Sequence, residues 1–138
     1  MNDFNYPING SCQCGNITYQ LLEPPLSFAA CHCIACQKLS ASAFSITAFV
    51  KTETVLFEGE MSEWKRIADN GNKNYAKFCP TCGNRIYHFN PDKPDILKLK
   101  PSYLSNTDII EPSVHIWVSK KQKWFKIPDG VKQYDEQP

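Results

Sequence analysis

The seven cysteines of this 138-residue chain fall into three tight groups, and this grouping constrains the fold and the chemistry more than any other feature. The groups are Cys12 with Cys14, then Cys31, Cys33 and Cys36, and finally Cys79 with Cys82. An odd number of cysteines argues against a disulfide framework, whereas close spacing is typical of metal sites. Zinc prefers sulfur ligands in a tetrahedron, so we predict that these groups bind zinc.

The division of the seven sulfurs between sites follows from counting. Cys79-Pro80-Thr81-Cys82-Gly83 has the spacing of a zinc knuckle, which supplies two of four ligands. The other two could come from Cys12 and Cys14, or from two members of the middle group, and spacing alone does not decide. The first pairing completes one four-cysteine site and leaves three sulfurs together. The second leaves one cysteine of the middle group on its own. We therefore expect two zinc ions per chain, one structural and one catalytic with an open coordination position.

Composition argues for an ordinary globular protein. The 42% hydrophobic and 21% charged residues are typical of one folded domain, which we expect to span residues 1–138. No long apolar run indicates a membrane segment, and a net charge of +1 does not favour nucleic acid. The basic run at residues 120–123 is too short to change that expectation. The polar start does not resemble a secretory signal, so we expect a reducing, cytoplasmic location.

Alternating apolar and polar residues predict a chain of short strands and turns. We expect strands within residues 17–21, 44–50, 54–58, 61–68, 73–78, 85–89, 95–99 and 114–118. Gly59 is positioned to join 54–58 and 61–68 in a hairpin, and residues 69–72 read Asp-Asn-Gly-Asn, a strong tight-turn signal. Only residues 34–39 suggest a short helix. The sequence therefore predicts an all-β domain of antiparallel strands.

Several motifs together resemble the family of glutathione-dependent formaldehyde-activating enzymes (Gfa), to which centromere protein V also belongs. The resemblance rests on residues 10–19, 31–44, 78–83 and 115–118, on Trp124, and on Asp129, Gly130 and Tyr134 near the end. It implies the Mss4-like zinc-binding fold, with zinc knuckles on antiparallel sheets. It also implies that Cys12, Cys14, Cys79 and Cys82 bind the structural zinc and that Cys31, Cys33 and Cys36 bind the catalytic one.

The resemblance also implies a reaction. In this family glutathione is joined to formaldehyde to give S-(hydroxymethyl)glutathione, so we expect a zinc-dependent carbon–sulfur lyase. Its partner would be a small thiol such as glutathione, or the aldehyde adduct of that thiol. The alternative is a non-catalytic zinc module that binds a protein or nucleic acid, because cysteine clusters more often hold structural than catalytic zinc.

Other residue types near these motifs have less specific interpretations. His32 lies between two ligands and is expected to point away and form a hydrogen bond, while His88 and His115 are expected in apolar strands. Trp64, Trp117 and Trp124 are expected to pack in the core or a lid. Lys38, Arg66 and Arg85 are candidates to bind carboxylates of a peptide-like thiol, although such residues are more often solvated.

Overall fold

The computed structural model describes residues 4–101 and 104–138, and most of its regular structure is β. The strands are β1 (Ile8–Ser11), β2 (Thr18–Leu21), β3 (Ser27–Cys31), β4 (Ser45–Lys51), β5 (Val55–Glu58), β6 (Ser62–Trp64), β7 (Tyr75–Phe78), β8 (Arg85–Phe89), β9 (Ile96–Leu99), β10 (Val114–Ile116) and β11 (Lys132–Gln133). One α-helix, α1 (Ile34–Ser40), and three short 3₁₀ turns, η1 (Thr52–Thr54), η2 (Thr107–Ile109) and η3 (Val118–Lys120), complete the described elements.

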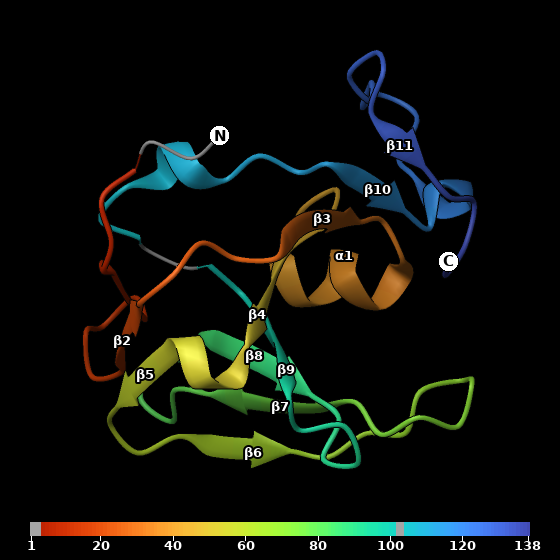
Figure 1. Ribbon diagram of the computed structural model, residues 1–138. Coiled ribbons are helices and arrows are strands. Elements are labelled where there is room, and N and C mark those ends of the chain that lie inside the picture. Colours follow the sequence, from red (N-terminus) through yellow and green to blue (C-terminus); the bar gives the residue numbers. More distant parts are fainter. Residues whose placement is uncertain (1–3, 102–103) are drawn as a thin grey trace.

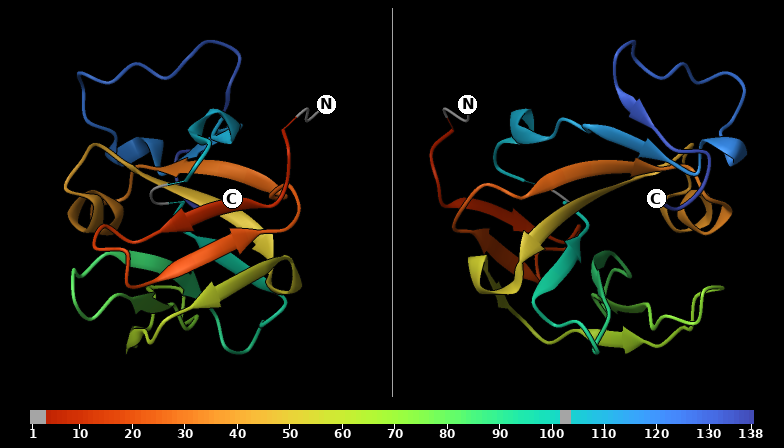
Figure 2. Two further views of the ribbon diagram at one scale, coloured as in Figure 1. Left: turned by 90° about the vertical axis from the view of Figure 1, so that its left-hand side faces the viewer. Right: turned by 45° about the vertical axis from the view of Figure 1, so that its right-hand side comes forward.

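The strands form two sheets. The smaller sheet has the order β1-β2-β5, and the larger has the order β11-β10-β3-β4-β9-β8-β7-β6. Figure 1 and the right-hand view of Figure 2 show the smaller sheet on one side of β4 and β9 and helix α1 on the other side. The two faces of these central strands therefore meet different surroundings.

Strand alternation assigns one of these faces to the hydrophobic core. Ala48 and Val50 of β4 and Leu97 and Leu99 of β9 are buried, and they pack in one cluster with buried residues of the smaller sheet such as Leu21. Successive side chains of a strand point to opposite faces, so the intervening residues lie on the side of the sheet where Figure 1 shows α1. On that face, polar side chains such as Ser45, Thr47 and Lys100 are also buried. The sheet thus separates an apolar core from a buried polar layer.

The all-β fold predicted from the sequence is confirmed. Strands occur in every predicted segment, the bounds of β8 match the prediction, and α1 begins at the predicted residue. The turn at residues 69–72 is also present, since the amide of Ala68 donates to the carbonyl of Asn72 at 2.8 Å. Strands β1, β3 and β11 were not predicted.

The predicted hairpin across Gly59 is wrong. Strands β5 and β6 flank this glycine but lie in different sheets, where β5 pairs with β2 and β6 pairs with β7. The reason is burial, because pairing with β2 places Phe57 opposite Tyr19 and the buried Val55 opposite Leu21. The chain leaves one sheet at Gly59 and enters the other.

Strand pairing is antiparallel in both sheets except at β10. This strand runs parallel to β3 on one side and to β11 on the other. Among the residues described, no helix is long and apolar enough to cross a membrane.

The close contact between β1 and β2 gives a test of the packing. A Cβ at Gly10 would overlap the ring of Tyr19, which is buried in the core. We expect Gly10→Ala to lower the free energy of unfolding by about 1–3 kcal/mol, the usual cost of overpacking. Urea unfolding measures this change, and Asn9→Ala, at an exposed position of the same strand, is the control. Equal stability of the two variants would contradict the packing described here.

Candidate metal centres

Two of the three cysteine groups come together at one point. Cys12 and Cys14 lie in the β1–β2 loop, and Cys79 and Cys82 lie in the β7–β8 loop. Their four sulfur atoms all lie within 4.8 Å of one another. The alternative pairing, in which the knuckle would share a site with the middle group, is therefore not the one that the fold brings together.

The spacing of these sulfurs fits a zinc ion. The Sγ atoms of Cys12 and Cys14 are 3.6 Å apart, and those of Cys14 and Cys79 are 3.7 Å apart. Zinc–sulfur bonds of about 2.3 Å in a tetrahedron place neighbouring sulfurs about 3.8 Å apart. A disulfide would need about 2.05 Å, and none of the seven cysteines forms one. The four sulfurs have the arrangement that a tetrahedral metal requires.

Backbone amides donate hydrogen bonds to these sulfurs and so stabilise the negative charge of a four-thiolate site. The amide of Ile17 donates to Sγ of Cys12 at 3.3 Å, and the amides of Thr81 and Cys82 donate to Sγ of Cys79 at 3.4 and 3.5 Å. These bonds require tight loops, and each loop has a glycine directly after its second cysteine. Gly15 and Gly83 both adopt positive φ, at 84° and 80°, which glycine tolerates best.

The two cysteine loops also bind one another directly. The side-chain oxygen of Asn84 accepts from the amide of Gln13 at 2.9 Å, and the side-chain amide of Asn16 donates to Thr81 Oγ1 at 3.1 Å. Asn84 also accepts, through its carbonyl, from the amide of Cys79 at 2.9 Å. A first loop from the smaller sheet is thus joined to a second loop from the larger sheet.

The third cysteine group forms a separate cluster at the start of α1. Cys31 ends β3, Cys33 is the N-cap of α1, and Cys36 lies in its first turn. Their sulfurs lie within 4.8 Å of one another, and the amide of Cys36 donates to Sγ of Cys33 at 3.3 Å. Three thiolates are the ligand set of an open zinc site, which leaves one position for another ligand. These three residues fit such an ion.

His32 points away from this cluster, as predicted. Its Nε2 lies 2.8 Å from Nδ1 of His115, and both side chains are buried. Burial lowers the pKa of both residues, so one neutral ring donates its N–H to the other. Phe44 and Phe125 pack against the pair. Among the described residues, neither His88 nor His115 groups with the three cysteines as a possible metal ligand.

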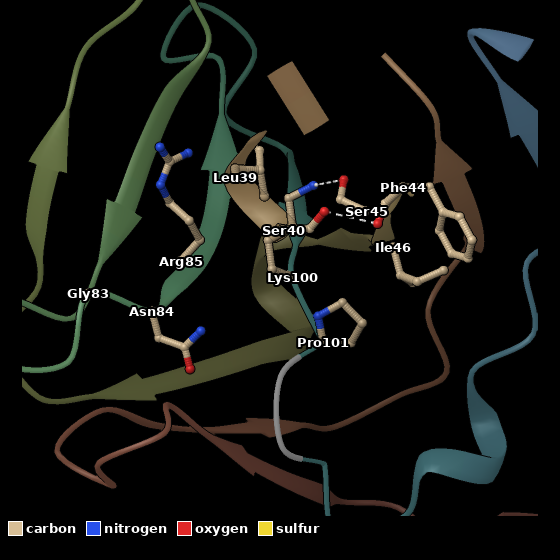
Figure 3. A pocket seen from close by; sticks show the side chains of 10 residues that line it. All are labelled: Leu39, Ser40, Phe44, Ser45, Ile46, Gly83, Asn84, Arg85, Lys100 and Pro101. Carbon is tan, nitrogen blue, oxygen red and sulfur yellow. Dashed lines mark hydrogen bonds between the residues drawn. The ribbon is translucent and has the colours of Figure 1, made fainter. Parts of the chain in front are cut away.

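A cavity of about 500 Å³ opens beside the three-cysteine cluster. Figure 3 shows Asn84 and Arg85 of the knuckle side on one wall, with Ser45 and Lys100 on the facing wall. Ser45 pairs with Cys31 in the β3–β4 register, which places this wall next to the cluster. The lining residues are Leu39, Ser40, Phe44, Ser45, Ile46, Gly83, Asn84, Arg85, Lys100 and Pro101.

The charges around this cavity are positive and are held in place. Lys100 Nζ donates to Thr47 Oγ1 at 2.7 Å and to Ser45 Oγ at 3.2 Å. Burial lowers the pKa of Lys100, and the nearby Cys36 and Cys31 oppose that effect. Arg85 lies 3.0 Å from Nε2 of His88. Burial, with Lys100 and Arg85 nearby, lowers the pKa of His88 to about 3, so His88 is neutral and accepts from Arg85.

Of the cationic residues proposed from the sequence, the structure brings only Arg85 to this cavity. Lys38 is exposed on α1, and neither it nor Arg66 lines the cavity. Lys100 was not predicted from the sequence. It continues the alternation of Leu97 and Leu99 on the opposite face of the strand, and a lysine in that position resembles one on a solvated face. Trp64 and Trp124, which were expected in the core or a lid, are 46% and 72% exposed, so neither packs in the core. Trp64 lies on β6, the edge strand of the larger sheet, which pairs with a neighbouring strand along one edge alone.

Comparison with known proteins identifies the family. A family model described as glutathione-dependent formaldehyde-activating enzyme matches residues 7–120. The chain belongs to this family. The two cysteine clusters that could bind zinc lie within the matched region, and the resemblance noted in the sequence is therefore confirmed.

Comparison of structures agrees on the fold. A crystal structure of a Rhodobacter sphaeroides protein aligns with a TM-score of 0.51 and 16% sequence identity, covering 91% of this chain and 98% of the other. At that identity the alignment supports the fold alone. No curated protein matches the chain significantly.

The two clusters predict a metal stoichiometry. Protein purified and kept reduced should contain about two zinc ions per chain, because each cluster has a ligand set suited to one ion. Elemental analysis measures the count. A reductant is needed, since metal-free Cys31, Cys33 and Cys36 are close enough to oxidise. A count of one that excess zinc does not raise would contradict an open site at these three cysteines.

The loss of each metal should have a different effect on folding. A structural zinc contributes on the order of 10 kcal/mol, comparable to the whole stability of a small domain. We expect Cys82→Ser to give unfolded or molten protein, because it breaks the site that joins the sheets. Cys33→Ser should stay folded with one metal fewer, since serine can still cap α1.

Circular dichroism and metal analysis of the two variants make this comparison. If Cys33→Ser unfolds as completely as Cys82→Ser, the three-cysteine cluster is structural as well. If it unfolds more readily, the roles of the two clusters are reversed.

Proposed function

We propose that this protein is a zinc-dependent carbon–sulfur lyase that acts on the adduct of a small thiol with a one-carbon aldehyde. The observation that carries this proposal is the three-cysteine cluster beside a polar cavity, in a chain that belongs to the formaldehyde-activating family. Glutathione is the thiol that the family description suggests. In the forward direction the sulfur attacks the carbonyl carbon, a carbon–sulfur bond forms, and the carbonyl oxygen takes up the proton released by the thiol.

In this proposal the two clusters have different roles. Cys12, Cys14, Cys79 and Cys82 hold a structural zinc with no open position. Cys31, Cys33 and Cys36 hold a second zinc, which when bound would accept the substrate sulfur and lower its pKa. A coordinated thiolate is less nucleophilic than a free one, so positioning of the thiol and stabilisation of the leaving sulfur would account for most of the rate gain.

The residues around the cluster suit this role. Ser40 Oγ donates to the carbonyl of Cys36 at 2.7 Å and lies close to the carbonyl of Phe44, which fixes the end of α1 against β4. Gln37 donates to the carbonyls of His32 and Lys120 at 2.8 and 3.0 Å. The ligands are therefore held by rigid elements, and the cavity lies beside them, since Ser45 of its lining pairs with Cys31. Seven cysteines without a disulfide suit a reducing compartment, and we propose that the protein acts in the cytoplasm.

The test is a titration of the cobalt-substituted protein with glutathione. Binding of a thiolate should add a sulfur-to-cobalt charge-transfer band, and the protein should accelerate exchange between glutathione and its formaldehyde hemithioacetal. Cys36→Ser should lose both effects. Ala35→Ser, which adds the same hydroxyl one residue away on α1, is the control and should keep both.

No spectral change with any thiol, together with equal exchange rates for the wild type and Cys36→Ser, would overturn the lyase assignment. A non-catalytic zinc module would then be the better description. A band with other thiols but not with glutathione would keep the enzyme class and exclude glutathione as its substrate.

A further inference from the structure

We propose that the cavity beside the three-cysteine cluster binds a carboxylate of the substrate, and that Arg85 and Lys100 make the protein selective for thiols that carry one. The inference rests on the proposed function, because the sulfur of the same substrate would occupy the open position at Cys31, Cys33 and Cys36. It adds a substrate class and two specificity residues to that function.

Lys100 is a buried cation without an acidic partner. Its side chain is only 9% exposed, and its ammonium group donates to Thr47 and Ser45, which are neutral. An ammonium group has three N–H donors, so one remains for a ligand. Within residues 4–101 and 104–138 the ion pairs are Lys73–Asp92 and Lys77–Glu63, and neither involves Lys100.

Arg85 supplies a second cation on the opposite wall of the cavity. Its guanidinium lies over the ring of Trp64, 5.1 Å from the centroid, and one of its nitrogens donates to His88. These contacts fix the guanidinium but do not neutralise it, because both partners are uncharged. None of the described residues that line the cavity is acidic. Arg85 therefore presents remaining donors without a counter-ion, and a carboxylate accepts from such donors in pairs.

The metal cluster cannot offset every cation around it. Three thiolates and one divalent zinc carry a net charge of −1, and a bound substrate thiolate makes it −2. Lys98 and Lys100, which both interact electrostatically with Cys36 and Cys31, balance that charge. Arg85 lies on the other wall, so its charge is left for a ligand. A partly buried charge without a partner is costly, and a bound carboxylate would compensate for that cost.

The remaining lining explains why this ligand should also be a small organic molecule. Leu39, Phe44 and Ile46 give part of the cavity an apolar surface, while Asn84 adds an amide. The side-chain oxygen of Asn84 already accepts from Gln13, which leaves its NH₂ group as a donor. A short carbon chain with a carboxylate at one end could pack against the apolar side chains and accept hydrogen bonds from the polar ones, while the sulfur at its other end reaches the metal.

The experiment compares two thiols of nearly equal shape. Cobalt-substituted protein is titrated with 3-mercaptopropionate and with its methyl ester, and the sulfur-to-cobalt band gives each dissociation constant. We expect the acid to bind at least about tenfold more tightly than the ester, as for one or more charge-assisted hydrogen bonds. Arg85→Met should remove most of this preference and leave ester binding unchanged, whereas Arg85→Lys should retain part of it.

Two further variants separate recognition from structural effects. Lys100→Met should also reduce the preference for the acid, and a folded protein with unchanged metal content makes that result interpretable. Lys51→Met is the control, because Lys51 is exposed and lies six residues from Ser45 on β4, roughly 20 Å away at 3.3 Å per residue. It should keep the wild-type preference.

The outcomes distinguish this inference from the function on which it rests. Equal binding of acid and ester by the wild type overturns carboxylate selection but leaves thiol binding intact. A preference that survives in both Arg85→Met and Lys100→Met also overturns it. Loss of acid and ester binding to the same degree in both variants assigns Arg85 and Lys100 a structural role only. No band with either thiol overturns the proposed function and this inference together.

Discussion

The four-sulfur cluster is the interaction on which the rest of the structure depends, because it joins loops from two different sheets. Cys12 and Cys14 come from the smaller sheet, whereas Cys79 and Cys82 lie about 65 residues further on in the larger one. A chain of 138 residues has limited apolar area to bury, and a zinc ion bound at this cluster would add a binding free energy on the order of the whole domain stability. Hydrogen bonds from Asn84 and Asn16 between the two loops give the ion a preformed site. The core between the sheets can then form around Leu21, Val50 and Leu99.

With the sheets fixed in this way, the alternation of β4 and β9 produces the second site. The side chains on one face of these strands complete the core, and those on the other face form a polar layer under α1. Ser45, Thr47 and Lys100 are buried there, and Leu39 and Ser40 of α1 line the same cavity as Ser45 and Lys100. Their burial creates a place where charge is costly and ligands of opposite charge are favoured. The cavity and the three-cysteine cluster belong to this layer, so their chemistry follows from the same alternation that builds the core.

Much of this could be predicted from the sequence, and the exceptions have physical reasons. The cysteine groups are local patterns, and β8 and β9 show the clear alternation of half-buried strands. Strand β3 was missed because Phe28, Ala29, Ala30 and Cys31 are all buried, so no alternation marks it. The partner of β5 and the parallel pairing of β10 depend on contacts between distant segments, which a local pattern does not contain. Lys100 donates to Ser45 and Thr47, 55 and 53 positions earlier in the chain, and so its role emerges only from the fold.

The two clusters also differ in how the fold supports them, which suits the different roles proposed for them. The loops of the four-cysteine cluster come from different sheets and are joined by hydrogen bonds of Asn84 and Asn16, and a metal bound there would strengthen that link. The three-cysteine cluster lies instead between β3, which is paired on both sides, and a helix tied down through Gln37 and Ser40. These contacts hold Cys31, Cys33 and Cys36 in place whether or not a fourth ligand is bound. In the proposed function a substrate thiol could therefore enter and leave without disturbing the sheets, and the free energy of its binding would serve to orient it for reaction.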